Sequence, residues 1–194
     1  MRQSAPVVTP TRDDKNQGAS QLTALQLTDI NALTLAGFIE HLGGVFEHSP
    51  WVAERAWQAR PFESVQALHE RMIEVVRKAG KDEQLALIRA HPELAGREAK
   101  SGALTVDSTS EQGRLGFMNL DRSHFEQMQE LNRTYRQRFG IPCIVALRLH
   151  ASRASVMAEM QRRLGNTVQA EMAAALEQIG HIARGRLENL VREK

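Results

Sequence analysis

Apolar residues recur every three or four positions through most of the chain, a spacing typical of amphipathic helices. Short polar or glycine-containing breaks separate these stretches, and Ser, Thr or Asn often stands where one begins. Glycine and proline are scarce inside them. The pattern predicts eight helices, at residues 31–42, 50–58, 64–79, 82–90, 110–120, 123–139, 152–164 and 168–193.

Two stretches depart from the helical period. Residues 1–24 are polar, with no period, and we expect a mobile extension there. Residues 141–147 are short, apolar and rich in β-branched side chains. A single strand would have nothing to pair with, so we expect an extended segment buried among helices. Without repeats or a clear boundary, residues 25–194 are predicted to form one all-α domain of about eight helices.

Composition narrows the class of protein without identifying it. The chain has 194 residues, 42% hydrophobic and 25% charged, which suits one globular core. Its formal net charge of +2 is too small to indicate a nucleic-acid-binding protein, although the pI is about 9.0. The arginine-rich run of residues 148–163 is interrupted by the acid Glu159, which favours a solvated helix face. No apolar run approaches the length of a membrane span.

The first candidate for chemistry is His91, at the end of the predicted helix 82–90. Pro92 stops that helix, because proline disfavours the α conformation of the residue before it. The unpaired carbonyls and the negative dipole end of the helix favour the imidazolium form. A histidine titrates near neutral pH and can hold or release a proton. A helix-capping histidine with no catalytic role remains the alternative.

Glu111 is the second candidate. Ser108 followed three residues later by Glu111 is the pattern of a capping box, which would explain the glutamate structurally. However, Glu111, Leu115 and Met118 share one face of the predicted helix. A carboxylate on an apolar face needs a partner. Both interpretations stay open on the sequence alone.

Two arginines near the end of the chain lie on different faces of the predicted last helix. Arg186 is in phase with the apolar residues Ile179, Ala183 and Leu190, so it is expected to point inward. Arg184 precedes Glu188 by four positions, the spacing of a solvated ion pair. Arg186 is therefore the candidate for binding an anion, and an arginine that anchors a buried carboxylate is the alternative.

Other chemistries find little support. His41 and His48 are separated by a Gly-Gly break, and no His-Glu-x-x-His motif or cysteine pair occurs, so no metal site is predicted. Cys143, the only cysteine, follows a proline in an apolar run and is expected to be a buried, inert thiol. A lone cysteine also fits a reducing compartment.

Four motifs together resemble one family. They are His91-Pro-Glu-Leu-Ala-Gly96, Ser108-x-x-Glu111-Gln112, Phe139-Gly-Ile-Pro142 and Arg184-x-Arg186-Leu187, and the likeness extends over residues 27–192. In this order they resemble OHCU decarboxylase, which acts on 2-oxo-4-hydroxy-4-carboxy-5-ureidoimidazoline (OHCU) in urate breakdown. The stretch from Gly44 to Ala53 also resembles the early part of that family.

The resemblance implies a specific activity and site. It implies decarboxylation of OHCU to (S)-allantoin and CO2 by a homodimer, and the chemistry of this substrate requires no cofactor in principle. The composition separately predicts a cytoplasmic protein that binds neither nucleic acid nor membrane. His91 and Glu111 would be the catalytic pair. Substrate would be bound by Pro92, Gln112, the backbone around Ile144, and Arg186.

One departure and one alternative accompany this prediction. The family usually has an aromatic residue after the proline of Phe-Gly-x-Pro, and this chain has Cys143 there, so the pocket wall is expected to differ. The alternative from another class is a non-catalytic helical interaction module that keeps the fold alone. It predicts that His91→Ala leaves every measurable property intact.

Overall fold

The structure, a computed structural model, describes residues 23–193, which are mostly α-helical. It confirms the predicted all-α class, with ten α-helices instead of about eight within the described residues. The α-helices are α1 (Leu27–Ala32), α2 (Leu35–Leu42), α3 (Trp51–Ala56), α4 (Val65–Lys78), α5 (Lys81–Ala90), α6 (Arg97–Ser101), α7 (Val106–Arg114), α8 (Arg122–Phe139), α9 (Arg153–Arg163) and α10 (Val168–Leu190). Two 3-10 turns, η1 (Trp57–Ala59) and η2 (Leu147–Leu149), complete the helical elements.

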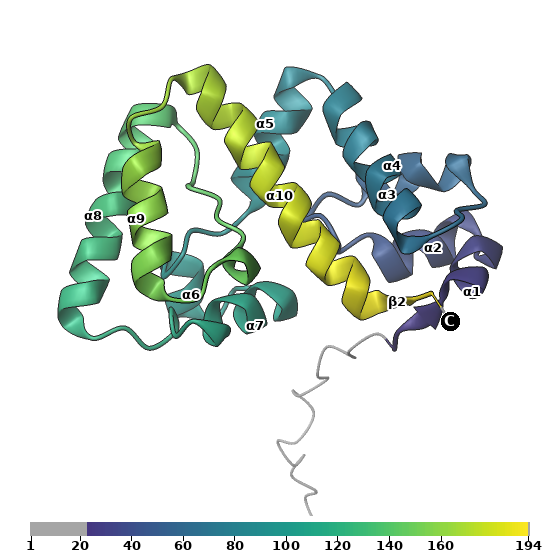
Figure 1. Ribbon diagram of the computed structural model, residues 1–194, viewed down its shortest axis with the longest axis horizontal. Coiled ribbons are helices and arrows are strands. Elements are labelled where there is room, and N and C mark those ends of the chain that lie inside the picture. Colours follow the sequence, from purple (N-terminus) through teal and green to yellow (C-terminus); the bar gives the residue numbers. More distant parts are fainter. Residues whose placement is uncertain (1–22, 194) are drawn as a thin grey trace, which may run out of the picture.

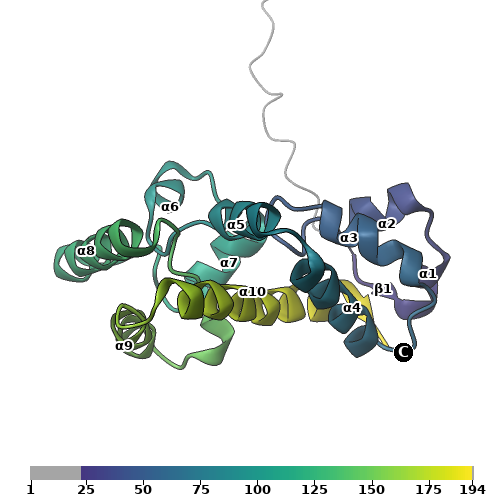
Figure 2. The ribbon, with the colours of Figure 1, turned by 90° about the horizontal axis from the view of Figure 1, so that it is seen from above.

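Helix α10 runs through the middle of the molecule and joins its two sides. Helices α1 to α4 lie on one side of it, and α8 and α9 lie on the other (Figures 1 and 2). Its buried face carries Ala175, Ile179, Ala183 and Leu187, which continue one apolar core through both sides. A residue on the inner face of α10 can therefore reach elements from either side.

The two ends of the described chain are tied together. Strand β1 (Leu25–Gln26) pairs in parallel with β2 (Val191–Arg192), with Leu25 opposite Val191. The predicted last helix therefore ends at Leu190, earlier than expected, because the chain turns extended to make this pairing. The prediction for residues 1–24 falls almost entirely outside the described residues.

Several predicted helix starts were wrong, and one error matters for function. Helix α7 begins at Val106, with the Thr105 hydroxyl accepting the Ser108 backbone N–H at 3.2 Å. Ser108 was expected to be that cap. Thr105 is an equally good cap three residues earlier, and its use leaves the Ser108 hydroxyl free for other contacts. Helix α7 also ends at Arg114, well before the predicted end at Leu120.

Two other boundaries differ for the same kind of reason. The helix predicted at residues 31–42 is two helices, and Thr34 caps the second with its side chain. Asp121, rather than Ser123, caps α8. In each case a second residue with a short polar side chain lies close by in the sequence and makes the capping hydrogen bond.

Residues 141–146 form the predicted extended segment, buried and outside any sheet. Side chains replace the missing strand partners. Arg163 donates to the Ile144 carbonyl at 2.6 Å, and the Gln178 side chain accepts from the Ala146 amide at 2.9 Å. Arg163 is itself buried against Glu171 and Tyr135. This network fixes the backbone that forms one wall of the site.

No helix among residues 23–193 combines the length and the apolar character needed to span a membrane.

Candidate active site

His91 follows the last residue of α5 directly, as Pro92 requires. Its backbone is extended (φ −77°, ψ 134°), and its ring Nδ1 lies 2.9 Å from the Leu87 carbonyl oxygen. A carbonyl can only accept, so Nδ1 carries the proton and Nε2 presents a lone pair. Nε2 is buried and has no hydrogen-bond partner among the described residues. A buried, unpaired ring nitrogen is available to a ligand.

The protonation state of His91 differs from the prediction. Burial lowers the pKa of His91 to about 4, although the Leu87 carbonyl and the Glu47 carboxylate both favour the charged form. The helix-end carbonyl acts in the expected direction, but the loss of hydration outweighs it. His91 is therefore neutral at pH 7, the state of a base.

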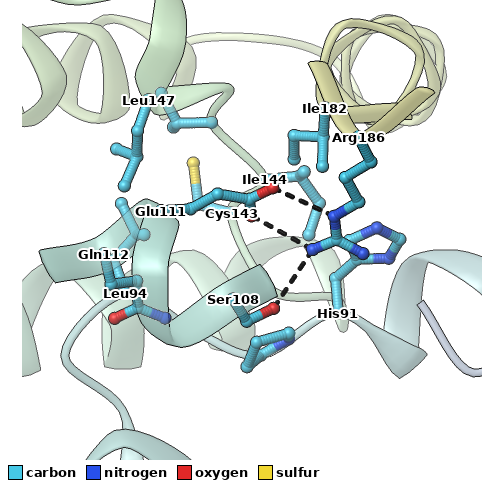
Figure 3. A pocket seen from close by; sticks show the side chains of 12 residues that line it. His91, Leu94, Ser108, Glu111, Gln112, Cys143, Ile144, Leu147, Ile182 and Arg186 are labelled. Atoms are coloured by element: carbon cyan, nitrogen blue, oxygen red, sulfur yellow. Dashed lines mark hydrogen bonds and ion pairs between the residues drawn. The ribbon is translucent and has the colours of Figure 1, made fainter. Parts of the chain in front are cut away.

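Glu111 and Arg186 form a two-point ion pair. Arg186 Nε donates to Glu111 Oε1 and Nη2 donates to Oε2, both at 3.0 Å (Figure 3). Burial raises the pKa of Glu111, and this effect exceeds the opposite effect of Arg186. Glu111 lies within α7, away from its start, so the capping-box interpretation of this residue was wrong.

The Arg186 guanidinium has a partner for each of its five N–H bonds. Besides Glu111, Nη2 contacts Ser108 Oγ at 3.2 Å, and Nη1 contacts Glu47 Oε2 at 2.7 Å and the Gly44 carbonyl at 3.4 Å. The carboxylates outweigh burial and hold the pKa of Arg186 above its usual value.

Arg186 points inward as predicted. Arg184 forms the predicted pair with Glu188 at 2.7 Å.

Glu47 is the site residue that the sequence interpretation missed. Its side chain is 1% exposed. Its carboxylate accepts hydrogen bonds from Thr105 Oγ1 at 2.8 Å and Ser108 Oγ at 3.1 Å, in addition to Arg186. An acid directly after the apolar residues Val45 and Phe46 was the signal that could have found it.

The six predicted site residues line a single cavity of about 40 Å³ (Figure 3). Of these, Gln112 has a role that was not predicted, because its Oε1 accepts from the Ala95 amide at 3.0 Å. That contact secures the turn after Pro92, where Ala95 has a positive φ of 50°. Ser108 also lines the cavity, and the rest of the wall is apolar, formed by Leu94, Cys143, Val145, Leu147 and Ile182.

A larger hollow of about 490 Å³ adjoins this cavity and shares Glu111, Leu147 and Ile182 with it. Because it is also lined by polar side chains such as Arg114 and Asn189, it offers a hydrated approach. Glu111 thus stands between the buried His91 and the outside.

The structure also describes the surroundings of the lone cysteine and the arrangement of possible metal ligands. Cys143 is buried, and desolvation raises its pKa to about 12, so it is the inert thiol that was expected. Within residues 23–193 no group of three or more His, Cys, Asp or Glu side chains is arranged to hold a metal ion.

The described residues form an all-α fold in which a neutral histidine and a glutamate–arginine pair meet at one cavity, an arrangement that suits a small helical enzyme. The profile of the OHCU decarboxylase family matches residues 31–188. A relative from Haloferax volcanii, named 2-oxo-4-hydroxy-4-carboxy-5-ureidoimidazoline decarboxylase, is 39% identical over 163 residues, which are 84% of this chain and 94% of the relative. The chain belongs to the OHCU decarboxylase family and is a decarboxylase.

Two solved structures are similar. The crystal structure of (S)-allantoin synthase aligns with a TM-score of 0.67 at 28% identity, over 86% of this chain and 54% of that one. The present chain thus spans about half of that longer protein. The crystal structure of OHCU decarboxylase in the presence of (S)-allantoin aligns with a TM-score of 0.61 at 19% identity, over 75% of this chain and 94% of that one, and shows the same fold.

Proposed function

We propose that this protein converts OHCU to (S)-allantoin and CO2, with His91 and Glu111 as catalytic residues. The observation that carries the proposal is the convergence of His91, Pro92, Glu111, Gln112, Ile144 and Arg186, from four separate segments, on one cavity. These are the positions that the sequence motifs single out. A cavity with one neutral base and an ion pair suits a reaction made of proton transfers and loss of a carboxylate.

The reaction balances with these groups, the substrate and one proton from water. When the bond to the carboxylate breaks, CO2 leaves, the electron pair passes into the adjacent ring imine, and the imine nitrogen gains that proton. The 4-hydroxyl must then lose a proton to become a ring carbonyl, and the ring carbon that bears the ureido group must gain one. His91 Nε2 can accept the hydroxyl proton and return a proton on one face, which would make the product a single enantiomer.

The chain's remaining groups would orient the substrate. Glu111 faces the cavity and can accept hydrogen bonds from ring or ureido N–H groups. Arg186 would contact the substrate directly only after exchanging one of its present partners, because its five donors are in use. The backbone around Ile144 and the ring of Pro92 would complete the wall. This chemistry needs neither a metal nor an organic cofactor in principle.

The activity is tested by coupling urate oxidase and hydroxyisourate hydrolase to the protein and following allantoin by circular dichroism, with a chelator present. We expect rapid formation of one enantiomer by the wild type and its loss in His91→Ala and Glu111→Gln. Arg122→Gln, an exposed change on α8, is the matched control. A slow racemic product equal to the protein-free reaction would refute the assignment and favour the non-catalytic helical module.

The assembly and location expected from the sequence belong to the same proposal. We propose a homodimer located in the cytoplasm, supported by the family membership. Sedimentation equilibrium at several concentrations tests the dimer, and a molar mass equal to one chain at all of them would refute it.

A further inference from the structure

We propose that Glu47 is a positioning residue that holds Arg186 permanently, so that Glu111 is the carboxylate that exchanges with the substrate. This inference deepens the proposed function and rests on it. It assigns different tasks to the two glutamates that share one guanidinium.

The two carboxylates differ in how firmly they are held. Glu47 is 1% exposed and is bound by Thr105, Ser108 and Arg186, which come from the cap of α7, the body of α7 and α10. Glu111 is 33% exposed, and within the described residues Arg186 is its only hydrogen-bonded partner. Displacing Glu47 would leave several buried groups unsatisfied, whereas Glu111 can turn toward the adjoining hollow.

The charges in the site support the same division. Arg186 carries one positive charge and the two glutamates carry two negative charges, while His91 is neutral. An anionic substrate would add a further negative charge to this poorly hydrated place, which is unfavourable unless a proton is taken up or a carboxylate moves away. Arg186 and the hydroxyl of Thr105 lower the pKa of Glu47 despite its burial, whereas burial raises that of Glu111.

Other charged groups around the pair act in the same direction. Asp107 on α7 further raises the pKa of Glu111. His48, next in the chain to Glu47, contributes slightly to lowering the pKa of His91. Glu111 is therefore the group that can accept a proton as the anion enters.

Glu47 also fixes the geometry between two helices. It lies in the loop between α2 and α3, and its oxygens bridge the start of α7 to the guanidinium on α10. The separation of Arg186 from Glu111 depends on this bridge. A displacement of about 1 Å in a catalytic group can cost on the order of 10²-fold in rate.

The test compares Glu47→Gln with Glu171→Gln. Both replace a buried carboxylate that is paired with a buried arginine. Glu171 pairs with Arg163, which supports the cavity wall at the Ile144 carbonyl, but neither Glu171 nor Arg163 lines the His91 cavity. For Glu47→Gln we expect kcat to fall at least tenfold while KM stays equal or falls, because the site loses one negative charge. Loss of that charge should also lower the pKa of His91, measured by 15N NMR of the ring. Glu171→Gln should leave that pKa at the wild-type value.

An unchanged His91 titration and a KM increase in Glu47→Gln would overturn the proposal. If Glu47→Gln does not fold, Glu47→Asp keeps the charge on a shorter side chain. It should then retain the His91 pKa while kcat falls, and wild-type kcat would refute the positioning role. The His91 titration needs no substrate, so it distinguishes failure of this inference from failure of the proposed activity, which His91→Ala and Glu111→Gln report.

Discussion

Burial of His91 in its neutral form makes the stability of the protein depend on pH in a calculable way. The pKa of this histidine is about 4 in the folded protein, against 6.5 for an ordinary histidine, because its ring is desolvated. Below pH 6.5 the unfolded chain binds a proton that the folded chain does not, so acid favours unfolding until the folded pKa is reached. This destabilisation of the folded protein is absent above pH 7 and grows as the pH falls from 6.5 to 4.

The magnitude follows from the two pKa values. At pH 5 about one and a half pH units of this window have been crossed, and each unit corresponds to about 1.4 kcal/mol, so the free energy of unfolding falls by about 2 kcal/mol. Replacing His91 with Gln removes the titrating group. Between pH 8 and pH 5 the wild type should therefore lose about 2 kcal/mol more than His91→Gln.

The assay is urea denaturation followed by far-UV circular dichroism at pH 8 and pH 5. The control is Ile88→Val, a buried change in α5, the helix that ends just before His91, and it should lower stability by about 1 kcal/mol equally at both pH values. Equal pH dependence of wild type and His91→Gln would show that His91 is not held neutral. A greater loss of stability in the variant would contradict the sign of the argument.

Three further outcomes are expected. Gly96→Ala should destabilise the protein by about 1–3 kcal/mol, because the Cβ of the new alanine would lie 2.9 Å from the Cβ of Glu93 in the turn after Pro92. Gly80→Ala is the control and should not destabilise the protein, because no atom lies within 4 Å of its added Cβ. Thermal melts compare the two variants. Cys143 should react with iodoacetamide at pH 8 only as fast as the protein opens, so mass spectrometry should show labelling accelerated by urea, and rapid native labelling would contradict its burial. Arg163→Met should cost about 3–5 kcal/mol by leaving Glu171 buried without its cation, and the double variant with Glu171→Leu should recover part of that loss in urea titrations.

Features decided by local covalent geometry could be predicted from the sequence. Pro92 ends α5 at His91 whatever packs around it, and the periodicity of α10 places Arg186 inward and Arg184 outward. Helix starts were less certain where two capping residues competed, as Thr105 and Ser108 do. Sequence spacing cannot decide between two side chains that are equally able to accept the same kind of hydrogen bond.

Features that depend on distant segments could not be predicted. The Gly44 carbonyl meets Arg186 across 142 positions of sequence, and Glu47 reaches the same guanidinium from the same loop. The protonation state of His91 was misjudged because the local helix end was visible in the sequence and the burial was not. A lone acid among apolar residues indicates only that some partner exists.

The central place of α10 has a consequence for the order in which the protein is made. Ribosomes deliver a chain from its N-terminus, so α10, the last helix described, emerges after every other element that contributes to the cavity. Until it docks, Glu47, Glu111 and Ser108 lack the cation that joins them. A nascent chain, or one terminated before α10, would therefore carry its histidine and glutamates but no assembled site, and activity would begin only after α10 has been synthesised.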